Sequence, residues 1–386
     1  MSLEDDALEL HSKNPGKISV EASVEIKGKE DLNLVYTPGV AEPCRKISED
    51  IDAAYDYTSK GNMVAVVSDG SAVLGLGDIG PEASMPVMEG KANLMKKFGD
   101  VNGFPVCVNA DSAEDIIEQT KAIEPTFGAI NLEDIKAPRC FKAEERLKEE
   151  LDIPVFHDDQ HGTAIVVAAA LRNALKIVEK DLEDSRIVVI GAGASGIAVS
   201  EFLISLGAEN IVPLDSTGIL RTEDENEYKT SLAERTLASE ESGDLNDAME
   251  DADVMIGLSA GGIVSKEMVE SMKDDSIVFA LANPDPEIMP SEAKEAGAEI
   301  VATGRSDFDN QVNNSLAFPG VFRGAIDARA SDINEEMKLA ASDVIMNFIE
   351  PEKNRIVPET LDKELAMKIA EKVEEAARSS GVARID

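Results

Sequence analysis

Short apolar runs alternate with longer amphipathic segments through the first half of the chain. The runs have the length of strands and are rich in Val, Ile and Phe, whereas the segments between them repeat apolar residues at helical spacing. Strands that alternate with helices indicate βαβ units and a parallel sheet. We expect strands at 64–67, 104–110, 127–132 and 153–156, and helices at 84–98, 112–122 and 141–151.

A second series of the same kind follows a long apolar segment at 162–180, which predicts a buried helix. Helical patterns also dominate residues 1–60, which VYTPGVAEPC interrupts, and the tail at 331–378. The strands of the second series are expected at 186–191, 210–215, 252–257, 276–283 and 299–304.

The pattern therefore predicts the fold class α/β with two domains. Residues 1–160 form the first, a substrate and metal domain with a parallel sheet, and 161–386 form a Rossmann-like domain with C-terminal helices. We expect the boundary near 158–163 and a cleft between the two halves.

A glycine-rich loop, GAGASG, stands between a β-branched run and an amphipathic helix, which is the context in which G-x-G-x-x-G binds a dinucleotide. The first glycine permits the tight turn, the second admits the pyrophosphate and the third lets helix and strand pack closely. The helix N-terminus then presents free N–H groups to the phosphates. The expected cofactor-binding residues of this loop are Gly191, Gly193, Ala194, Ser195 and Gly196. A glycine-rich turn without a ligand is the alternative.

Asp215 ends the next expected strand and bears on the choice of cofactor. An acid in this position can accept hydrogen bonds from ribose hydroxyls, which favours NAD over NADP. Ser216 and Thr217 follow, where a lysine or arginine would bind a 2′-phosphate, but Arg221 is close enough in sequence to leave NADP open. The sequence favours NAD slightly and excludes neither cofactor.

Two acidic pairs come at the ends of expected strands of the first domain. Glu133 and Asp134 close FGAINLED, and Asp158 and Asp159 close IPVFHDD. Ligands bind at the carboxyl ends of strands in open parallel sheets, and hard divalent cations prefer carboxylate oxygens. The pairs therefore predict a site for Mg²⁺ or Mn²⁺, with plain surface charge as the alternative.

Two further side chains are candidates for proton transfer. Lys91 lies among apolar residues in MPVMEGKANLMKKFG, and partial burial lowers the pKa of a lysine so that it can act as a base. A lysine at a helix edge more often simply extends to solvent. Tyr36 precedes a Pro-Gly turn in VYTPGVA, and a packed loop aromatic is its plain alternative.

The net charge of −39, from 76 acidic and 37 basic residues, limits the possible partners. Such a surface repels nucleic acid and anionic membranes, so we expect neither as a partner. In molar salt the screening length is about 3 Å, which removes most of the self-repulsion. Because the acid is spread along the chain, we expect adaptation to a high-salt cytoplasm rather than a docking patch for a basic partner.

Localisation is expected to be cytoplasmic. The N-terminus has no apolar signal region, and the longest apolar stretch, 164–171, is far shorter than a membrane span. Cys44, Cys107 and Cys140 are odd in number and widely spaced, as in reduced intracellular proteins, and Cys107 is expected in the core.

A series of motifs, from about residue 14 to residue 380, resembles the malic enzymes in content and order, in the short bacterial and archaeal form. The motifs are VYTPGVAEPCR, VSDGSAVLGLGDIGP, MPVMEGKA, NLEDIKAPRCF, PVFHDDQHGTA, IGAGASG, ALANPDPEI and NNSLAFPGVFRGA. The resemblance implies oxidative decarboxylation of L-malate to pyruvate and CO₂, with NAD or NADP and Mg²⁺ or Mn²⁺. It also suggests a homodimer in which Tyr36 and Lys91 act across the interface.

The resemblance also implies roles for individual residues. The metal ligands would be Glu133, Asp134 and Asp159, the general base Lys91 with Asp158 as its paired carboxylate, and the general acid Tyr36. Asn283 and Asn314 would hold the malate carboxylates, with Asn313 a weaker candidate and Asn283 also near the cofactor. The arginine that long members use for a substrate carboxylate has no counterpart.

Four other functions remain in competition with the malic enzyme reaction. Malolactic chemistry uses NAD without net reduction, and a plain dehydrogenase needs neither the acid Tyr36 nor the decarboxylating metal. A nucleotide-binding regulator would be expected to lose Lys91 or a metal carboxylate. A zinc hydrolase is suggested by HDDQH (157–161), but we expect a strand before this segment and a break at Gly162 rather than the required helix.

Overall fold

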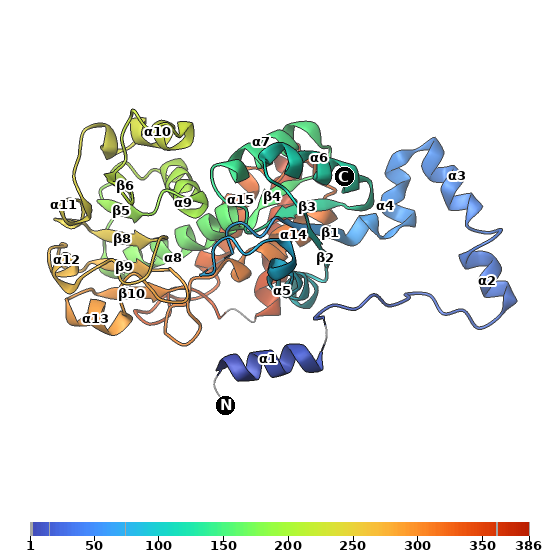
Figure 1. The fold of residues 1–386 in the computed structure, drawn as a ribbon, viewed down its shortest axis with the longest axis horizontal. Coiled ribbons are helices and arrows are strands. Elements are labelled where there is room, and N and C mark those ends of the chain that lie inside the picture. Colours follow the sequence, from blue (N-terminus) through green and yellow to red (C-terminus); the bar gives the residue numbers. More distant parts are fainter. Residues whose placement is uncertain (1–2, 15, 74, 360–361, 386) are drawn as a thin grey trace.

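Two parallel sheets flanked by helices lie side by side, and an N-terminal arm extends from one end of the molecule (Figure 1). The structure, a computed structural model, describes residues 3–14, 16–73, 75–359 and 362–385. The expected α/β class with two sheets is confirmed.

The first sheet has the strand order β2-β1-β3-β4, with all its pairings parallel. Its strands are β1 (Met63–Ser68), β2 (Asn102–Cys107), β3 (Ala129–Leu132) and β4 (Val155–His157), and its helices are α5 (Pro81–Gly99), α6 (Ala113–Ile123), η3 (Glu124–Thr126) and α7 (Arg139–Glu150). All four expected strands are present. The second begins and ends earlier than expected and lies at the sheet edge, so Cys107 is only half-buried and packs at the margin of the core.

The second sheet has the order β10-β9-β8-β5-β6-β7. Its parallel strands are β5 (Ile187–Ile190), β6 (Ile211–Asp215), β8 (Val254–Gly257), β9 (Ile277–Ala280) and β10 (Ile300–Thr303), and the short β7 (Gly218–Ile219) pairs antiparallel with β6. Its surrounding helices are α9 (Ala194–Ser205), α10 (Glu227–Glu234), η5 (Leu237–Ser239), α11 (Leu245–Met249), α12 (Lys266–Glu270) and α13 (Pro290–Glu295). The sequence pattern missed β7, because two residues carry no detectable period.

One continuous helical segment joins the two sheets. It starts as the π-helical turn η4 (Asp158–Gly162) directly after β4 and continues as α8 (Thr163–Val178), whose face of Ala, Val and Ile is almost fully buried. Within the described residues, Asp158–Val178 is the one helix whose length and apolar composition would suffice to cross a membrane, and 67% of its apolar window is buried in the protein. Burial of this kind is what the core helix of a folded domain requires.

The last helices pack on both halves of the molecule. They are η6 (Asn314–Leu316), α14 (Phe318–Asp327), α15 (Glu335–Asn347) and α16 (Lys363–Ser379). Helix α14 packs closely against α16 and against α5 of the first sheet, whereas α15 packs against α8. The C-terminal helices expected to belong to the second domain therefore also cover the helix that carries Lys91.

The N-terminal arm consists of short helices that project from the first sheet (Figure 1). They are α1 (Leu3–Lys13), α2 (Lys29–Val35), α3 (Ala41–Glu49), η1 (Ile51–Ala53), α4 (Ala54–Tyr57) and η2 (Ser59–Asn62). None of the described residues of α2 and α3 is buried. The arm nevertheless exposes large apolar side chains, among them Val20, Leu34, Tyr36 and Ile51.

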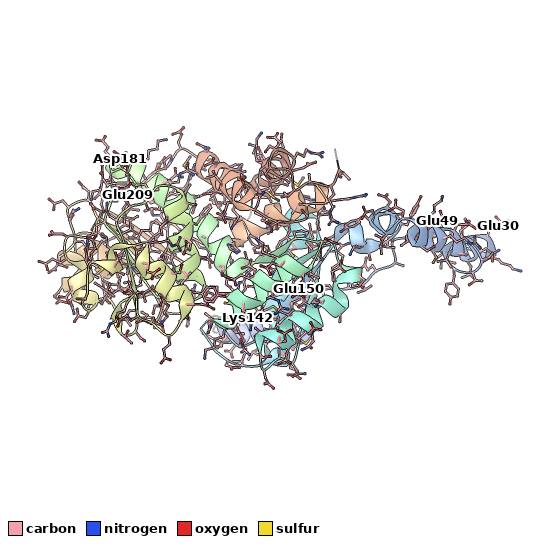
Figure 2. The ribbon with its side chains drawn as sticks, turned by 90° about the horizontal axis from the view of Figure 1, so that it is seen from above. Glu30, Glu49, Lys142, Glu150, Asp181 and Glu209 are labelled. Atoms are coloured by element: carbon pink, nitrogen blue, oxygen red, sulfur yellow. The ribbon has the colours of Figure 1, made fainter. Side chains whose placement is uncertain are left out.

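Acidic side chains are distributed over all parts of the molecule. Figure 2 shows Glu30 and Glu49 on the arm, Glu150 on α7, and Asp181 and Glu209 at the opposite end, all of them exposed. A single docking patch would instead gather the charge on one face.

Glycine in α14 lets this helix approach α16 closely. A Cβ on Gly324 would lie 2.5 Å from the carbonyl oxygen of Ala370, whereas a Cβ on Gly90 in α5 would meet nothing closer than 3.9 Å. We expect Gly324→Ala to lower the free energy of unfolding by about 1–3 kcal/mol, because the helices must separate.

Gly90→Ala is the matched control, since it makes the same change in a helix with free space. It should raise the free energy of unfolding by up to about 1 kcal/mol through helix propensity alone. Urea unfolding in molar KCl measures both variants. Equal effects of the two substitutions would contradict the close packing of α14 on α16.

Candidate active site

Strand pairing brings the two acidic pairs together. In the parallel pair β3 and β4, Leu132 lies opposite His157, so the residues after both strands leave the sheet at the same edge. Carboxylate oxygens of Glu133, Asp134 and Asp159 all lie within 4.8 Å of one another. The glutamate and the first aspartate are nearly fully buried.

Lys91 enters this cluster from α5. Its Nζ lies 2.9 Å from Oε1 of Glu133 and donates a hydrogen bond to Oδ2 of Asp158. The same ammonium lies 4.7 Å from the ring centre of Phe318, the first residue of α14. A cation over an aromatic face is stabilised by the ring quadrupole, so α14 helps to fix the lysine. Asp158 is fully buried.

The titration of the cluster is dominated by burial and mutual repulsion. Burial raises the pKa of Glu133 to about 7 and that of Asp158 to about 7, in both cases against the attraction of Lys91. Burial and the neighbouring Asp159 raise the pKa of Asp134 to about 9. Burial is the largest cause of all three shifts, and like charges that share the buried site add to it.

The expectation that Lys91 has a lowered pKa is wrong for this arrangement. Burial acts in that direction, but the negative charges of Asp158 and Glu133 outweigh it and raise the pKa of the lysine. The surrounding carboxylates could not be recognised from the apolar neighbours of Lys91 along α5, since they come from strands distant in sequence.

The backbone of the cluster is specialised at two positions. Asp134 has a φ of 54°, a left-handed conformation that is uncommon for a residue with a side chain, and its N–H donates to Oδ2 of Asp159 at 2.8 Å. A Cβ on Gly162 would lie 1.8 Å from Oδ1 of Asp158. Gly162 therefore does not break the chain as expected. It continues the π-helical turn, and the position requires glycine because a Cβ would occupy the space of the Asp158 side chain.

The donor set fits a hard divalent cation. Among the residues that the structure describes, the buried oxygens Oδ2 of Asp134 and Oδ1 of Asp158 have no hydrogen-bond partner. A buried oxygen without a partner is costly unless a cation or a proton satisfies it. The Asp134 oxygen belongs to the three carboxylates that converge, and oxygen ligands of this kind suit Mg²⁺ or Mn²⁺.

The glycine-rich loop has the geometry of a dinucleotide site. Gly191 ends β5 with a φ of 110°, which favours glycine, and Gly193 caps the N-terminus of α9 with nothing within 4 Å of its Cβ position. A Cβ on Gly196 would lie 1.6 Å from the carbonyl oxygen of Gly191, so helix and strand could not pack as they do. Ala194 and Ser195 begin the helix, whose N–H groups face the open space above the loop.

Asp215 ends β6, where an acid binds ribose in Rossmann folds. The sequence did not reveal its ion pair with Lys229 of α10, whose Nζ lies 2.5 Å from Oδ2 of Asp215. Burial acts to raise the pKa of Asp215, but the hydrogen bonds from Lys229 and Thr217 outweigh it and lower the pKa. At the end of β6, the carboxylate of Asp215 could accept a hydrogen bond from a ribose hydroxyl, and the ammonium of Lys229 could pair with a 2′-phosphate.

One cleft of about 140 Å³ connects the carboxylate cluster with the glycine-rich loop. The expected site residues on its wall are Asp159, Ser195, Asn283, Asn313 and Asn314. The amides follow β9 and β10 of the second sheet, whereas the carboxylate comes from the turn after the first sheet. Groups for a metal, a dinucleotide and a carboxylate substrate therefore face the same space between the halves.

Tyr36 is an expected site residue that neither lines this cleft nor lies in the carboxylate cluster. It is the C-terminal cap of α2, it is 67% exposed, and it lies on the projecting arm (Figure 1).

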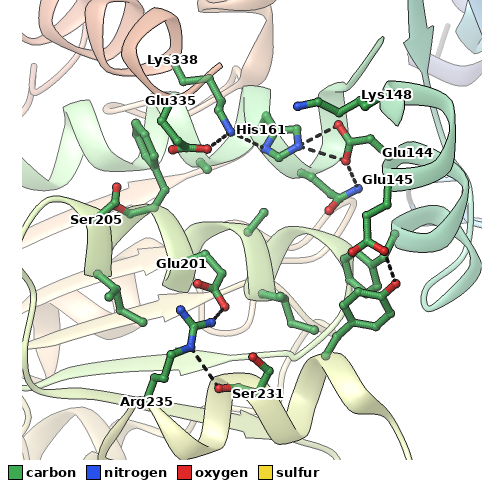
Figure 3. A pocket seen from close by; sticks show the side chains of 18 residues that line it. Glu144, Glu145, Lys148, His161, Glu201, Ser205, Ser231, Arg235, Glu335 and Lys338 are labelled. Carbon is green, nitrogen blue, oxygen red and sulfur yellow. Dashed lines mark hydrogen bonds and ion pairs between the residues drawn. The ribbon is translucent and has the colours of Figure 1, made fainter. Parts of the chain in front are cut away.

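The zinc alternative fails on His161, one of the two histidines that it requires. His161 uses Nε2 to contact Glu144 and Nδ1 to contact Lys338, so neither ring nitrogen is free for a metal (Figure 3).

Comparison with known proteins identifies the family. The family model of the malic enzyme N-terminal domain matches residues 15–148, and that of the malic enzyme NAD binding domain matches residues 160–378. The chain is 54% identical to the bifunctional malic/malolactic enzyme of Bacillus subtilis, across 100% of this chain and 95% of that protein. It is 53% identical to the NAD-dependent malic enzyme of Geobacillus stearothermophilus, across 96% of this chain and 78% of that protein.

The chain belongs to the malic enzyme family.

Solved malic enzyme structures share the fold. The NAD-dependent malic enzyme of Thermotoga maritima superimposes with a TM-score of 0.93 at 51% identity, covering 96% of this chain and 99% of that chain. The malic enzyme of Pyrococcus horikoshii gives a TM-score of 0.95 at 47% identity, covering 100% and 93%. The resemblance stated from the motifs is confirmed, and so is oxidative decarboxylation of malate with NAD or NADP as the activity of this family.

Sequence reasoning missed three residues of this malic enzyme site: Phe318, Lys229 and Glu144. Phe318 could have been suspected, because it lies in NNSLAFPGVFRGA, a motif that carried the resemblance. Lys229 and Glu144 gave no signal, since both lie in charge-rich helices where most charged residues face solvent.

The raised carboxylate pKa values predict how metal stabilises the protein at different pH. Glu133, Asp134 and Asp158 titrate at about 7, 9 and 7 in the metal-free fold, compared with about 4 in an unfolded chain. The metal-free folded state therefore binds more protons, and its stability falls as the pH rises from about 4 to about 9. Metal bound to the ionised carboxylates offsets this loss.

We therefore expect Mg²⁺ to raise the melting temperature more near pH 8.5 than near pH 6, with a difference of about 3 °C or more. Thermal melts with Mg²⁺ and with EDTA at both pH values measure this. Asp159→Asn should remove the Mg²⁺ effect at both pH values. A Mg²⁺ effect that is the same at both pH values in the wild type would contradict the titration of the cluster.

Proposed function

We propose that the cleft between the two halves converts L-malate to pyruvate and CO₂ with reduction of NAD or NADP, in the cytoplasm. One observation carries the proposal: Asp159, Ser195, Asn283 and Asn314 line a single cleft. Lys91 and its two carboxylate partners, Glu133 and Asp158, lie at the end of the first sheet, from which Asp159 also comes. Malate oxidation needs a base, a site for the nicotinamide and groups for two carboxylates, and the cleft together with the adjacent Lys91 cluster offers all three.

Glu133, Asp134 and Asp159 would hold the divalent cation. Bound there, Mg²⁺ or Mn²⁺ supplies Lewis acidity that lowers the pKa of the malate hydroxyl. Every further step is assigned to side chains of the protein.

Lys91 would accept the proton of the C2 hydroxyl, and a bound nicotinamide would supply the acceptor for the hydride of C2. The lysine must release its own proton first, and Asp158 is the acceptor in contact with it. The pKa of Asp158 is raised to about 7, so this carboxylate can take up a proton near neutral pH. Interacting groups of this kind titrate as a pair rather than one by one.

Asn283 and Asn314 orient the substrate by donating amide hydrogen bonds to its carboxylates, with Asn313 beside them. Asn313 is less suited, because its side-chain oxygen accepts from the N–H of Ser315 and caps η6. Oxidation at C2 yields a β-keto acid, from which CO₂ leaves readily at C4. Tyr36 then protonates C3 of the resulting enolate.

We infer that Tyr36 reaches the cleft of a second copy in a homodimer. The arm that carries it buries none of the described residues of α2 and α3, yet it exposes Leu34, Val35 and Ile51. An apolar surface on a chain of net charge −39 is unfavourable in water unless a partner covers it. A second copy of the chain would cover the arm and receive the tyrosine.

Complementation between inactive variants tests this exchange. Tyr36→Phe and Lys91→Ala should each abolish most of the activity. Refolding an equal mixture should restore about a quarter of it, because half of the dimers are mixed and each mixed dimer has one site with both residues intact. Steady-state NADH formation measures the recovery, and Tyr36→Phe mixed with itself is the control. No recovery in mixed dimers would mean that Tyr36 serves its own chain or has no role.

A second candidate function is malolactic conversion of malate to lactate without net reduction of the cofactor. The observation that favours it is the bifunctional malic/malolactic enzyme of Bacillus subtilis, which is 54% identical to the chain. Both reactions share oxidation and decarboxylation, and they differ in whether pyruvate leaves before the reduced cofactor reduces it.

The deciding assay uses the protein in molar KCl with L-malate, Mn²⁺ and either NAD or NADP. We expect absorbance at about 340 nm to rise together with pyruvate, whereas lactate without net reduced cofactor would identify malolactic turnover. Lys91→Ala and Asp159→Ala should lower kcat by at least about 100-fold while the circular dichroism stays unchanged. Absence of turnover with both cofactors in high salt and metal would reject the proposal.

A further inference from the structure

The turn that follows β4 carries two carboxylates that must point in different directions. Asp158 contacts Lys91, whereas Asp159 lies with Glu133 and Asp134. Adjacent carboxylates repel each other when both are ionised. A group on the other side of the turn is therefore needed to hold its backbone.

Glu144 of α7 lies on that other side and is 5% exposed. Its Oε1 accepts from the backbone N–H of His157 at 3.2 Å and contacts Nε2 of His161 at 2.8 Å. Its Oε2 accepts from Nε2 of Gln160 at 3.1 Å. One buried carboxylate thus binds the residues immediately before and after the Asp158-Asp159 pair.

A second contact, at Nδ1 of His161, fixes the orientation in which the imidazole meets Glu144. The ammonium of Lys338 on α15 lies 3.4 Å from Nδ1 of His161, and Figure 3 shows the imidazole between Lys338 and Glu144. A lysine ammonium can only donate, so Nδ1 accepts and Nε2 carries the proton that is donated to Glu144. Lys338 is itself 5% exposed and forms an ion pair with Glu335.

The chain of contacts therefore runs from α15, through Lys338 and His161, to Glu144 on α7. These contacts lie on the side of Gln160 and His161, whereas Asp159 of the same turn lines the cleft. Groups that hydrogen-bond the segment carrying a metal ligand set the orientation of that ligand, and losing one typically costs about 10- to 100-fold in metal affinity or activity.

We propose that Glu144 is a positioning residue of the malic enzyme site: it holds the 157–161 turn so that Asp158 faces Lys91 and Asp159 faces Glu133 and Asp134. The proposal rests on the proposed function in one respect, which is that Asp159 binds the divalent cation. Glu144 touches neither substrate nor cofactor, and it acts through the backbone of His157 and the side chains of Gln160 and His161.

The adjacent Glu145 offers a matched control. It lies on the same helix, and its carboxylate lines the same cavity of about 520 Å³ as that of Glu144 (Figure 3). It accepts from the hydroxyl of Tyr228 on α10 at 3.0 Å, and so it links the two halves without binding the turn. Replacing either glutamate with glutamine removes the same charge from the same place on α7.

The experiment measures Mn²⁺ binding directly on the full-length protein in molar KCl, by the electron paramagnetic resonance signal of free Mn²⁺, without malate or cofactor. We expect Glu144→Gln to weaken Mn²⁺ binding by about 10- to 100-fold and Glu145→Gln to leave it within about 2-fold. NADH binding, followed by its fluorescence, should be unchanged in both, because the described hydrogen bonds of Glu144 all go to residues 157, 160 and 161 and none goes to the glycine-rich loop.

A purely structural role of Glu144 would lower the melting temperature without separating metal from cofactor affinity. Gln160→Met removes one donor to Glu144 and leaves no buried charge unpaired, so it serves as the second variant if Glu144→Gln does not fold. We expect it to weaken Mn²⁺ binding by about 10-fold. Wild-type Mn²⁺ affinity in a folded Glu144→Gln, or in Gln160→Met if the first does not fold, would overturn the proposal.

Asp159→Asn separates this proposal from the proposed function. Mn²⁺ binding that Asp159→Asn weakens and Glu144→Gln does not contradicts the positioning role alone. Mn²⁺ binding that Asp159→Asn leaves intact contradicts the metal assignment, and the positioning role falls with it. Equal losses for Glu144→Gln and Glu145→Gln would show an effect of surface charge and would also overturn the positioning role.

Discussion

Mutual repulsion among buried carboxylates is the constraint on this site, and the other groups of the site hold the carboxylates in place against it. Glu133, Asp134, Asp158 and Asp159 come together around a single ammonium, that of Lys91. Two like charges about 4 Å apart repel by about 4 kcal/mol at the effective dielectric of a protein surface, and by more where water is excluded. Such an arrangement persists only where the surrounding fold fixes each group and a cation or protons balance the charge.

Three elements that are distant in sequence supply this fixation. The parallel register of β3 and β4 sets where the carboxylates leave the sheet. Helix α5 brings Lys91 to them, and α14 places Phe318 against the lysine. The packing of α14 on α5 and α16 is therefore part of the active site, although α16 itself contributes none of the proposed site residues.

Much of the fold could be predicted from the sequence, because period and turn chemistry are local. The parallel strands, the glycine-rich loop and the acidic strand ends each had a recognisable pattern within a short window. The pKa of Lys91 was predicted in the wrong direction, because its carboxylate partners come from other strands. Gly162 was expected to end regular structure, as its propensity suggests, whereas its missing Cβ makes room for Asp158 inside a helical turn. Glu144 looked like any surface acid until its partners were known.

The chain order of the helices that cover α5 has a consequence for folding during synthesis. Helix α5 is synthesised early, but the helices that cover it, α14 and α16, come from the last quarter of the sequence. During synthesis the face of α5 that meets α14 and α16 therefore stays exposed until those later helices have been made. The segment that forms the first sheet therefore does not complete its own core, and the Phe318 contact of Lys91 forms only once α14 is present.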